Sequence, residues 1–133
     1  MPLKASIEFW LIGEELDISE CEHVFEVKPH KCLVKGENIK HGKTGKFLRI
    51  QPHTVWGFSS KDYEKSEDLA VHEKWMFNII QKNKEFIKSN SNISELCFEF
   101  CLYGIDTFVV THKFIELCNY IGADIGFLSH SKA

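Results

Sequence analysis

The sequence lacks a signal peptide, a membrane segment, a low-complexity stretch and a strong net charge. Its N-terminus has no apolar stretch of the kind that directs secretion. No apolar run approaches the roughly 20 residues that a membrane helix needs. The net charge of −3 gives no general attraction to nucleic acid. These absences predict a cytoplasmic protein with no membrane partner.

What the sequence has is the composition of a globular protein. Of its 133 residues, 44% are hydrophobic and 26% charged, and eleven are phenylalanine and three tryptophan. We expect a single domain over residues 1–133 with a core rich in aromatic rings. Five cysteines are an odd number, and without an export signal they are expected to be reduced thiols.

The clearest structural signal lies at residues 96–110. Apolar residues alternate over Leu96–Tyr103, which predicts a half-buried strand. Gly104–Asp106 is typical of a turn, and Thr107–Val110 is rich in β-branched and aromatic residues. The segment therefore predicts a hairpin at the centre of a sheet.

A second strand is expected at Lys4–Ile12, which also alternates. Asp17 follows as an N-cap, with Glu20 three residues later as in a capping box. This pair predicts a short helix over Ile18–Phe25, and Pro29 stops any helix before it.

Two longer helices are predicted. The first runs over Glu67–Ser89, capped by Ser66, with His72 at the boundary of its apolar stripe. The second begins after Thr111, runs to Ile121 and ends at Gly122. Their expected buried residues are Leu69, Trp75, Met76, Ile79, Ile80, Phe86 and Ile87 in the first helix, and Phe114, Ile115, Leu117, Cys118 and Ile121 in the second.

The remaining segments complete the predicted fold. Extended structure is expected at His30–Gly36, Phe47–Ile50, Thr54–Ser60 and Ala123–Leu128, with a polar loop at Glu37–Gly45. The fold class is α+β: a two-layer domain with a mostly antiparallel sheet of about five or six strands, two main helices and one short helix.

Motifs that could carry chemistry are incomplete. Gly42-Lys43-Thr44 resembles the end of a phosphate-binding loop, but five residues instead of four separate Gly42 from Gly36, and no helix follows. Cys97 and Cys101 share a strand face, yet lie roughly 13 Å apart along it, too far to bind one metal ion. We therefore expect no catalytic residue, no metal site and no cofactor.

Two surfaces are candidates for binding. Glu8 and Trp10 on one strand, and Glu99 and Tyr103 on another, fall on the less apolar faces. If the strands are neighbours, these residues form either an ordinary solvated sheet face or a recognition face with aromatic anchors.

The second candidate is a basic segment, Lys28–Arg49. It has seven basic residues and one acid, Glu37, so its formal charge is +6 and that of the remainder is −9. The segment is either a solvated loop whose lysines prevent unwanted strand pairing, or a basic finger that grips an acidic partner. Its central lysines are Lys40, Lys43 and Lys46.

The ordered motifs resemble a bacterial family, the domain of unknown function DUF4279. Gly13–Cys21 is similar to its G-x-x-L-D-x-x-x-I run, with Cys21 where the family usually has an aliphatic residue. Pro29 followed by Lys35–Glu37 is similar to its P-x-x-x-x-x-K-G-(D/E) pattern, and Trp56–Ser60 resembles its W-x-x-S-S strand end. The resemblance covers nearly the whole chain.

This resemblance brings no catalytic residues. It implies that Lys35, Gly36, Trp56 and Ser59 are positions that define the fold. Small proteins of this kind occur among the immunity proteins of bacterial toxin systems, so the resemblance implies a protein that binds and neutralises a cognate toxin domain.

Three hypotheses about function therefore stand at this point. The first is a non-enzymatic protein-binding domain, an immunity protein whose partner is a toxin domain. The second is a small ligand-binding domain or enzyme that uses the sheet face around Glu8, Trp10, Glu99 and Tyr103. The third is RNA binding through Lys28–Arg49, which the scarcity of aromatic residues among the lysines disfavours. The oligomeric state stays open.

Overall fold

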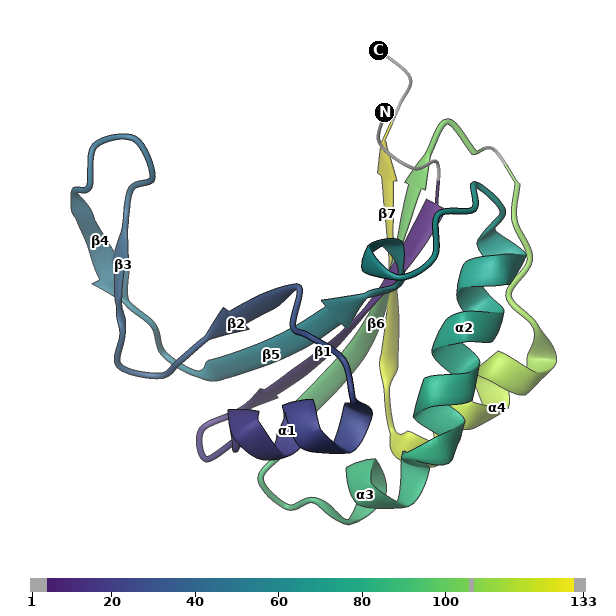
Figure 1. Cartoon of the computed structure of the whole chain (residues 1–133), viewed down its shortest axis with the longest axis horizontal. Helices are drawn as coiled ribbons and strands as arrows, with labels where there is room; N and C mark the ends of the chain where they lie inside the picture. Colours follow the sequence, from purple (N-terminus) through teal and green to yellow (C-terminus); the bar gives the residue numbers. More distant parts are fainter. Residues whose placement is uncertain (1–4, 106, 131–133) are drawn as a thin grey trace.

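A computed structural model describes residues 5–105 and 107–130 of the chain. This part of the chain forms a five-stranded sheet in the order β2-β5-β1-β6-β7, a separate two-stranded hairpin and four α-helices (Figure 1). The elements are β1 (Ala5–Gly13), α1 (Ile18–Phe25), β2 (Lys31–Leu33), β3 (Asn38–Lys40), β4 (Phe47–Ile50), β5 (Thr54–Ser59), the short 3₁₀ helix η1 (Ser60–Asp62), α2 (Leu69–Lys82), α3 (Lys84–Ser89), β6 (Glu95–Tyr103), α4 (His112–Ile121) and β7 (Asp124–His130). The predicted α+β class is confirmed.

Strand β1 is the centre of the sheet. It pairs antiparallel with β5 and β6, and β2 pairs antiparallel with β5, whereas β7 runs parallel to β6. As the alternation predicts, one face of β1 is fully buried: Ala5, Ile7, Phe9 and Leu11. The predicted strand starts at Lys4, which lies outside the described residues.

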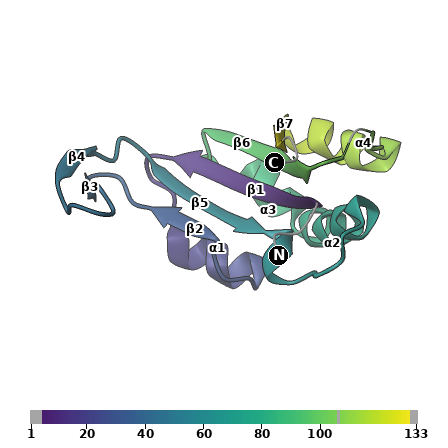
Figure 2. The same ribbon diagram turned by 90° about the horizontal axis from the view of Figure 1, so that it is seen from above.

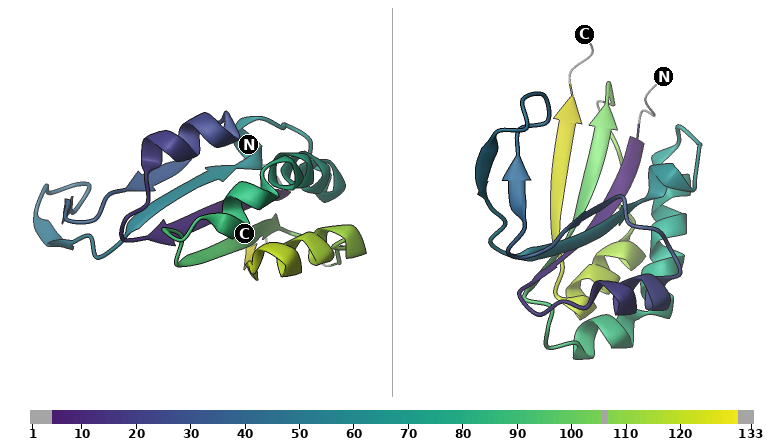
Figure 3. Two further views of the ribbon diagram at one scale, coloured as in Figure 1. Left: turned by 90° about the horizontal axis from the view of Figure 1, so that it is seen from below. Right: turned by 60° about the vertical axis from the view of Figure 1, so that its left-hand side comes forward.

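All four helices cover one face of the sheet. The β3–β4 hairpin lies beyond the ends of β2 and β5 (Figure 2), on the side of the sheet away from the helices (Figure 3, right). Aromatic contacts join the two layers. Phe25 of α1 stacks on Trp56 with ring centroids 5.5 Å apart, and Phe114 of α4 meets Phe98 edge-on at 4.9 Å. The core therefore lies between the helices and one sheet face, which leaves the other face open.

The ends of α1 and α4 follow the capping residues that the sequence predicts. The side chain of Asp17 accepts a hydrogen bond from the Glu20 N–H, and α1 spans the predicted residues. Thr111 accepts from the Phe114 N–H at the start of α4, and Gly122 adopts the left-handed conformation at its end, with φ of 75°. These local signals place α1 and α4 correctly.

The predicted central hairpin is wrong. Residues 107–110 form no strand, and Asp106, in the expected turn, lies outside the described residues. Both sides of β6 are already occupied, because β1 pairs with one and β7 with the other. The segment instead leads to α4, and the Thr111 N–H donates to Oε2 of the buried Glu73 at 3.1 Å.

The long helix is also corrected. Asn83 divides it into α2 and α3, because its side-chain Nδ2 donates to the Ile79 carbonyl at 2.9 Å and competes with the backbone. The cap is Asp68 and not Ser66, whose hydroxyl instead accepts from the Asp68 N–H. Ile115 is 47% exposed, since it lies one position off the buried stripe of α4.

His72 is fully buried and not at a boundary. Oγ of Ser60, also buried, accepts from the Ile7 N–H at 2.8 Å, so its own proton can go to His72 Nδ1, 2.7 Å away. Nε2 of the same ring then donates to the Ser66 carbonyl at 2.6 Å. This chain of hydrogen bonds ties β1, η1 and the entry to α2 together.

Candidate protein-binding surface

The face of the sheet that the helices leave uncovered is called the open face here. The register places Glu8 directly opposite Glu99, and Trp10 opposite Cys97. The open face is contributed by Ser6, Glu8, Trp10 and Ile12 of β1, Val55, Gly57 and Ser59 of β5, Lys31 and Leu33 of β2, Cys97, Glu99, Cys101 and Tyr103 of β6, and Asp124, Gly126 and Leu128 of β7. The two strands of the predicted recognition face are therefore neighbours.

Two glutamates opposite one another are an uncommon arrangement, because like charges across a strand pair are destabilising. Both side chains are half-buried. Oε2 of Glu8 lies 3.8 Å from the Cys101 thiol, which donates to it. A cationic group from a partner would relieve the repulsion between the two carboxylates.

The indole of Trp10 lies on Gly57. A Cβ at residue 57 would lie 2.7 Å from Trp10 Cδ2 and 2.8 Å from the Phe9 carbonyl oxygen. No side chain fits between them, so glycine provides the space in which the ring lies flat. Trp10 is thereby held at one position on the open face.

A groove of about 370 Å³ runs past Trp10 on the open face. Its lining includes Glu99 from β6 and two cations, Lys31 from β2 and Arg49 from β4. The structure thus brings part of the predicted recognition face next to part of the predicted basic segment. This juxtaposition depends on strand order, which sequence spacing does not reveal.

The other predicted residues lie away from the groove. Tyr103 is on the open face but four residues beyond Glu99, at the far end of β6, and is 40% exposed. Lys40, Lys43 and Lys46 are exposed around the turn that joins β3 to β4. They therefore form an extension of the surface and not part of the groove.

Residues Asn38–Ile50, called the arm here, project from the sheet on its open side (Figure 3). At its base, the Gln51 N–H donates to the Glu37 carbonyl at 2.8 Å, and at its tip the His41 N–H donates to the Lys46 carbonyl at 2.7 Å. Phe47, Leu48 and Ile50 are 53%, 55% and 58% exposed. The sequence predicts extended structure at Phe47–Ile50, but it does not predict that these apolar side chains remain exposed.

Two buried polar atoms beside the groove have no hydrogen-bond partner among the described residues. They are Nε1 of Trp10 and Oε1 of Gln51, and both residues line the groove. Nε2 of Gln51 is satisfied by the His53 carbonyl at 2.8 Å. Each of these two residues thus lines the groove and also carries one buried polar atom that no described residue satisfies.

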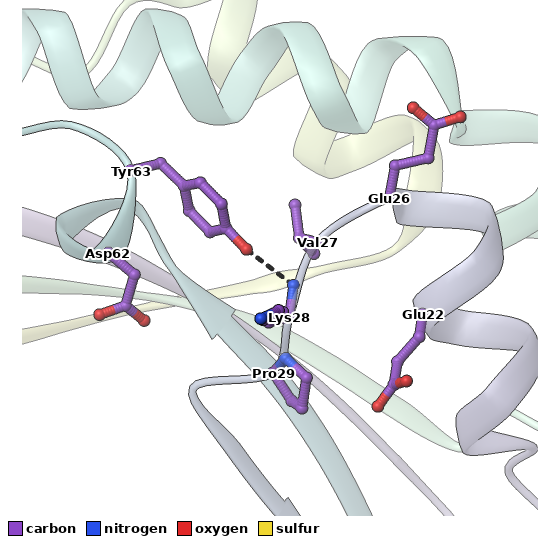
Figure 4. Close-up of a pocket in the computed structure, with 7 residues that line it drawn as sticks. All are labelled: Glu22, Glu26, Val27, Lys28, Pro29, Asp62 and Tyr63. Atoms are coloured by element: carbon purple, nitrogen blue, oxygen red, sulfur yellow. Dashed lines mark hydrogen bonds between the residues drawn. The ribbon is translucent and has the colours of Figure 1, made fainter.

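A larger hollow of about 800 Å³ lies on the opposite side, between α1 and the Asp62–Tyr63 turn (Figure 4). Carboxylates of Glu22, Glu26 and Asp62 line it. The Tyr63 hydroxyl accepts from the Lys28 N–H at 2.7 Å, which fastens the chain after α1 to the turn. This hydrogen bond across the hollow therefore has a structural role.

The thiols of the open face are weak nucleophiles. Burial, together with the nearby Glu8, raises the pKa of Cys101 to about 11, and burial also raises the pKa of Cys97. A raised pKa lowers the fraction of reactive thiolate at neutral pH. Within residues 5–105 and 107–130, no group of three or more His, Cys, Asp or Glu side chains is placed to hold a metal ion.

The chain belongs to the family described as a domain of unknown function, DUF4279, which it matches over residues 3–132. No curated protein and no solved structure matches the chain. No helix in the described part of the chain is long and apolar enough to cross a membrane.

Proposed function

We propose that this protein is a non-catalytic, cytosolic protein-binding domain that acts as an immunity protein and neutralises a toxin domain. The arm and the groove side of the open face form its binding surface. The partner presents an acidic surface with apolar residues at its centre.

The observation that carries this proposal is the exposure of the arm. A two-stranded hairpin with no covering layer is marginally stable in water, and this one places Phe47, Leu48 and Ile50 in solvent. Grouped exposed apolar side chains rimmed by charge mark protein interaction sites. The rim here is basic, with Lys40, Lys43, Lys46 and Arg49, which favours an acidic partner.

The same surface favours protein over RNA. Glu99 lines the groove, and Glu8 lies opposite it on the neighbouring strand. Phosphates would be repelled there, whereas a protein partner can bring a cation to the glutamates and acids to the arm. Phe47 offers one ring on which a base could stack, whereas its exposed apolar neighbours Leu48 and Ile50 are aliphatic and offer none.

The test begins with affinity capture from the source organism and ends with toxicity. The captured protein is purified, its affinity for the chain is measured, and its toxicity to cells is scored with and without the chain. We expect Leu48→Asp to weaken binding at least tenfold and to abolish protection, since central apolar residues dominate interfaces. Ile115→Asp, at a comparably exposed residue on α4, is the matched control and should leave both unchanged.

A charge reversal tests the electrostatic part separately. Lys46→Glu should slow association with the toxin and reduce the salt dependence of the association rate. Lys74→Glu on α2 is the control, because it makes the same charge change on the helix side of the molecule. The proposal is wrong if the captured protein is not toxic, or if both aspartate variants protect equally. It is also wrong if the arm variants instead reduce affinity for single-stranded RNA with a steep salt dependence.

A further inference from the structure

The two edges of the five-stranded sheet differ in how well they are protected. Strand β2 has only three residues, carries Lys31 and follows Pro29, which are features that discourage pairing with another chain. Strand β7 forms the other edge and has seven residues, with Gly126, Phe127 and Leu128 at its centre and no lysine or proline. A long, apolar edge of this kind is a template for another strand.

Aromatic rings extend across the buried face of the sheet and end in solvent at β7. Phe58 meets Phe9 at 5.7 Å and Phe9 meets Phe98 at 4.7 Å, while Phe100 meets Phe127 at 5.4 Å. Phe127 is nevertheless 52% exposed. The ring of Phe108 lies 5.1 Å from that of Phe127 and is itself 39% exposed, so the two rings form an exposed apolar patch beside β7.

We propose that two copies of the chain pair through antiparallel β7 strands and form a continuous ten-stranded sheet. A two-fold axis perpendicular to the sheet keeps each residue on its own face, so residues of the same parity must lie opposite one another. The register that pairs all seven residues is centred on Phe127. The ring of one copy then covers the exposed ring of the other.

The same register also brings complementary side chains of the two β7 strands together on the open face. It places Leu128 opposite Gly126 of the second copy, and a side chain at Gly126 would have open space around it, the nearest atom being the Phe98 carbonyl oxygen at 3.9 Å. A large residue therefore meets a vacant position twice, by symmetry. A strand from an unrelated protein would have no reason to present this large-against-small pattern.

The two-fold axis also determines on which side of the dimer the helices and the open faces lie. Both helical layers lie on one side of the extended sheet, and both open faces and both arms lie on the other. The dimer would present two copies of the proposed toxin-binding surface in the same direction. Pairing through β7 is independent of the arm, so it can hold or fail separately from the proposed function.

The experiment is sedimentation equilibrium of the full chain at increasing concentration. We expect the mass to rise from 15.4 kDa towards twice that value. Phe127→Lys and Phe127→Glu should each stay monomeric, because the register brings two like charges together at the axis. An equimolar mixture of the two variants should dimerise again, and Phe47→Lys, equally exposed but on the arm, should dimerise like the parent chain.

Amide hydrogen exchange provides a readout that needs no substitution. Amides of β7 should become more protected at high protein concentration, while those of the arm should not change. A parent chain that is monomeric at every concentration overturns the proposal. So does a dimer that Phe47→Lys abolishes, or one that the mixed charge variants fail to restore while each variant remains folded by circular dichroism.

Discussion

Replacing Gly57 with alanine tests whether the missing side chain positions Trp10. The added Cβ would lie 2.7 Å from Trp10 Cδ2 and 2.8 Å from the Phe9 carbonyl oxygen. Real Cβ contacts are essentially never that close, so the ring and the β1 backbone must both move. The change affects a residue of the candidate surface without touching the arm.

The magnitude is the difference between two effects. Inserting a methyl group into a well-packed position costs about 1–3 kcal/mol. Alanine also restricts the unfolded chain, which returns about 0.4–1 kcal/mol. We therefore expect the free energy of unfolding to fall by about 1–2 kcal/mol, which for a chain of this length lowers Tm by about 3–8 °C.

Thermal and urea unfolding of both glycine variants measure this effect. Gly42→Ala, in the exposed turn of the arm, is the control and should not lower Tm, since no atom lies within 4 Å of an added Cβ there. In a Trp10→Ala background the penalty of Gly57→Ala should shrink by about 1 kcal/mol, because only the clash with the Phe9 carbonyl remains. Equal Tm values for Gly57→Ala and the parent chain would refute the reasoning.

Three further predictions concern the fold and the thiols. Ser60→Ala should reduce the free energy of unfolding by about 2–4 kcal/mol, because the Ile7 N–H and His72 Nδ1 both lose their hydrogen-bond partner. Urea denaturation measures this loss, and a value below about 0.5 kcal/mol would contradict the prediction. Thr111→Ala should cost about 1 kcal/mol in the same assay through loss of the α4 cap, whereas an unchanged midpoint would show that the cap is dispensable. Burial raises the pKa of Cys21 and Cys118 to about 12. In native protein at mildly alkaline pH, these two thiols should therefore react with a thiol reagent far more slowly than exposed Cys32, which mass spectrometry can follow. Faster labelling of Cys118 than of Cys32 would argue against this packing.

Local signals predicted the elements that carry their own boundary residues. Asp17 with Glu20 predicted α1, and Thr111 with Gly122 predicted α4, because a cap is made by residues a few positions apart. Alternation predicted the buried face of β1 because a strand's side chains point to opposite sides whatever its neighbours are.

Predictions failed where distant segments compete for the same partner. Thr107–Val110 has the composition of a strand, but β7 occupies the side of β6 that it would need. His72 fits the boundary of a helical stripe by spacing, yet Ser60 and the Ser66 carbonyl make a fully buried position acceptable. Composition cannot anticipate either outcome, since both depend on chain segments brought together by folding.

For the candidate surface, the sequence by itself determined which residues share a strand face and that Lys28–Arg49 is basic. Only the tertiary structure decided that Glu8 and Glu99 are direct cross-strand neighbours, that Arg49 reaches the groove of Trp10, and that Tyr103 does not. It also decided that Phe47, Leu48 and Ile50 remain in solvent. The physical reason is that periodicity is a property of one strand, whereas strand order, register and burial are properties of the whole sheet.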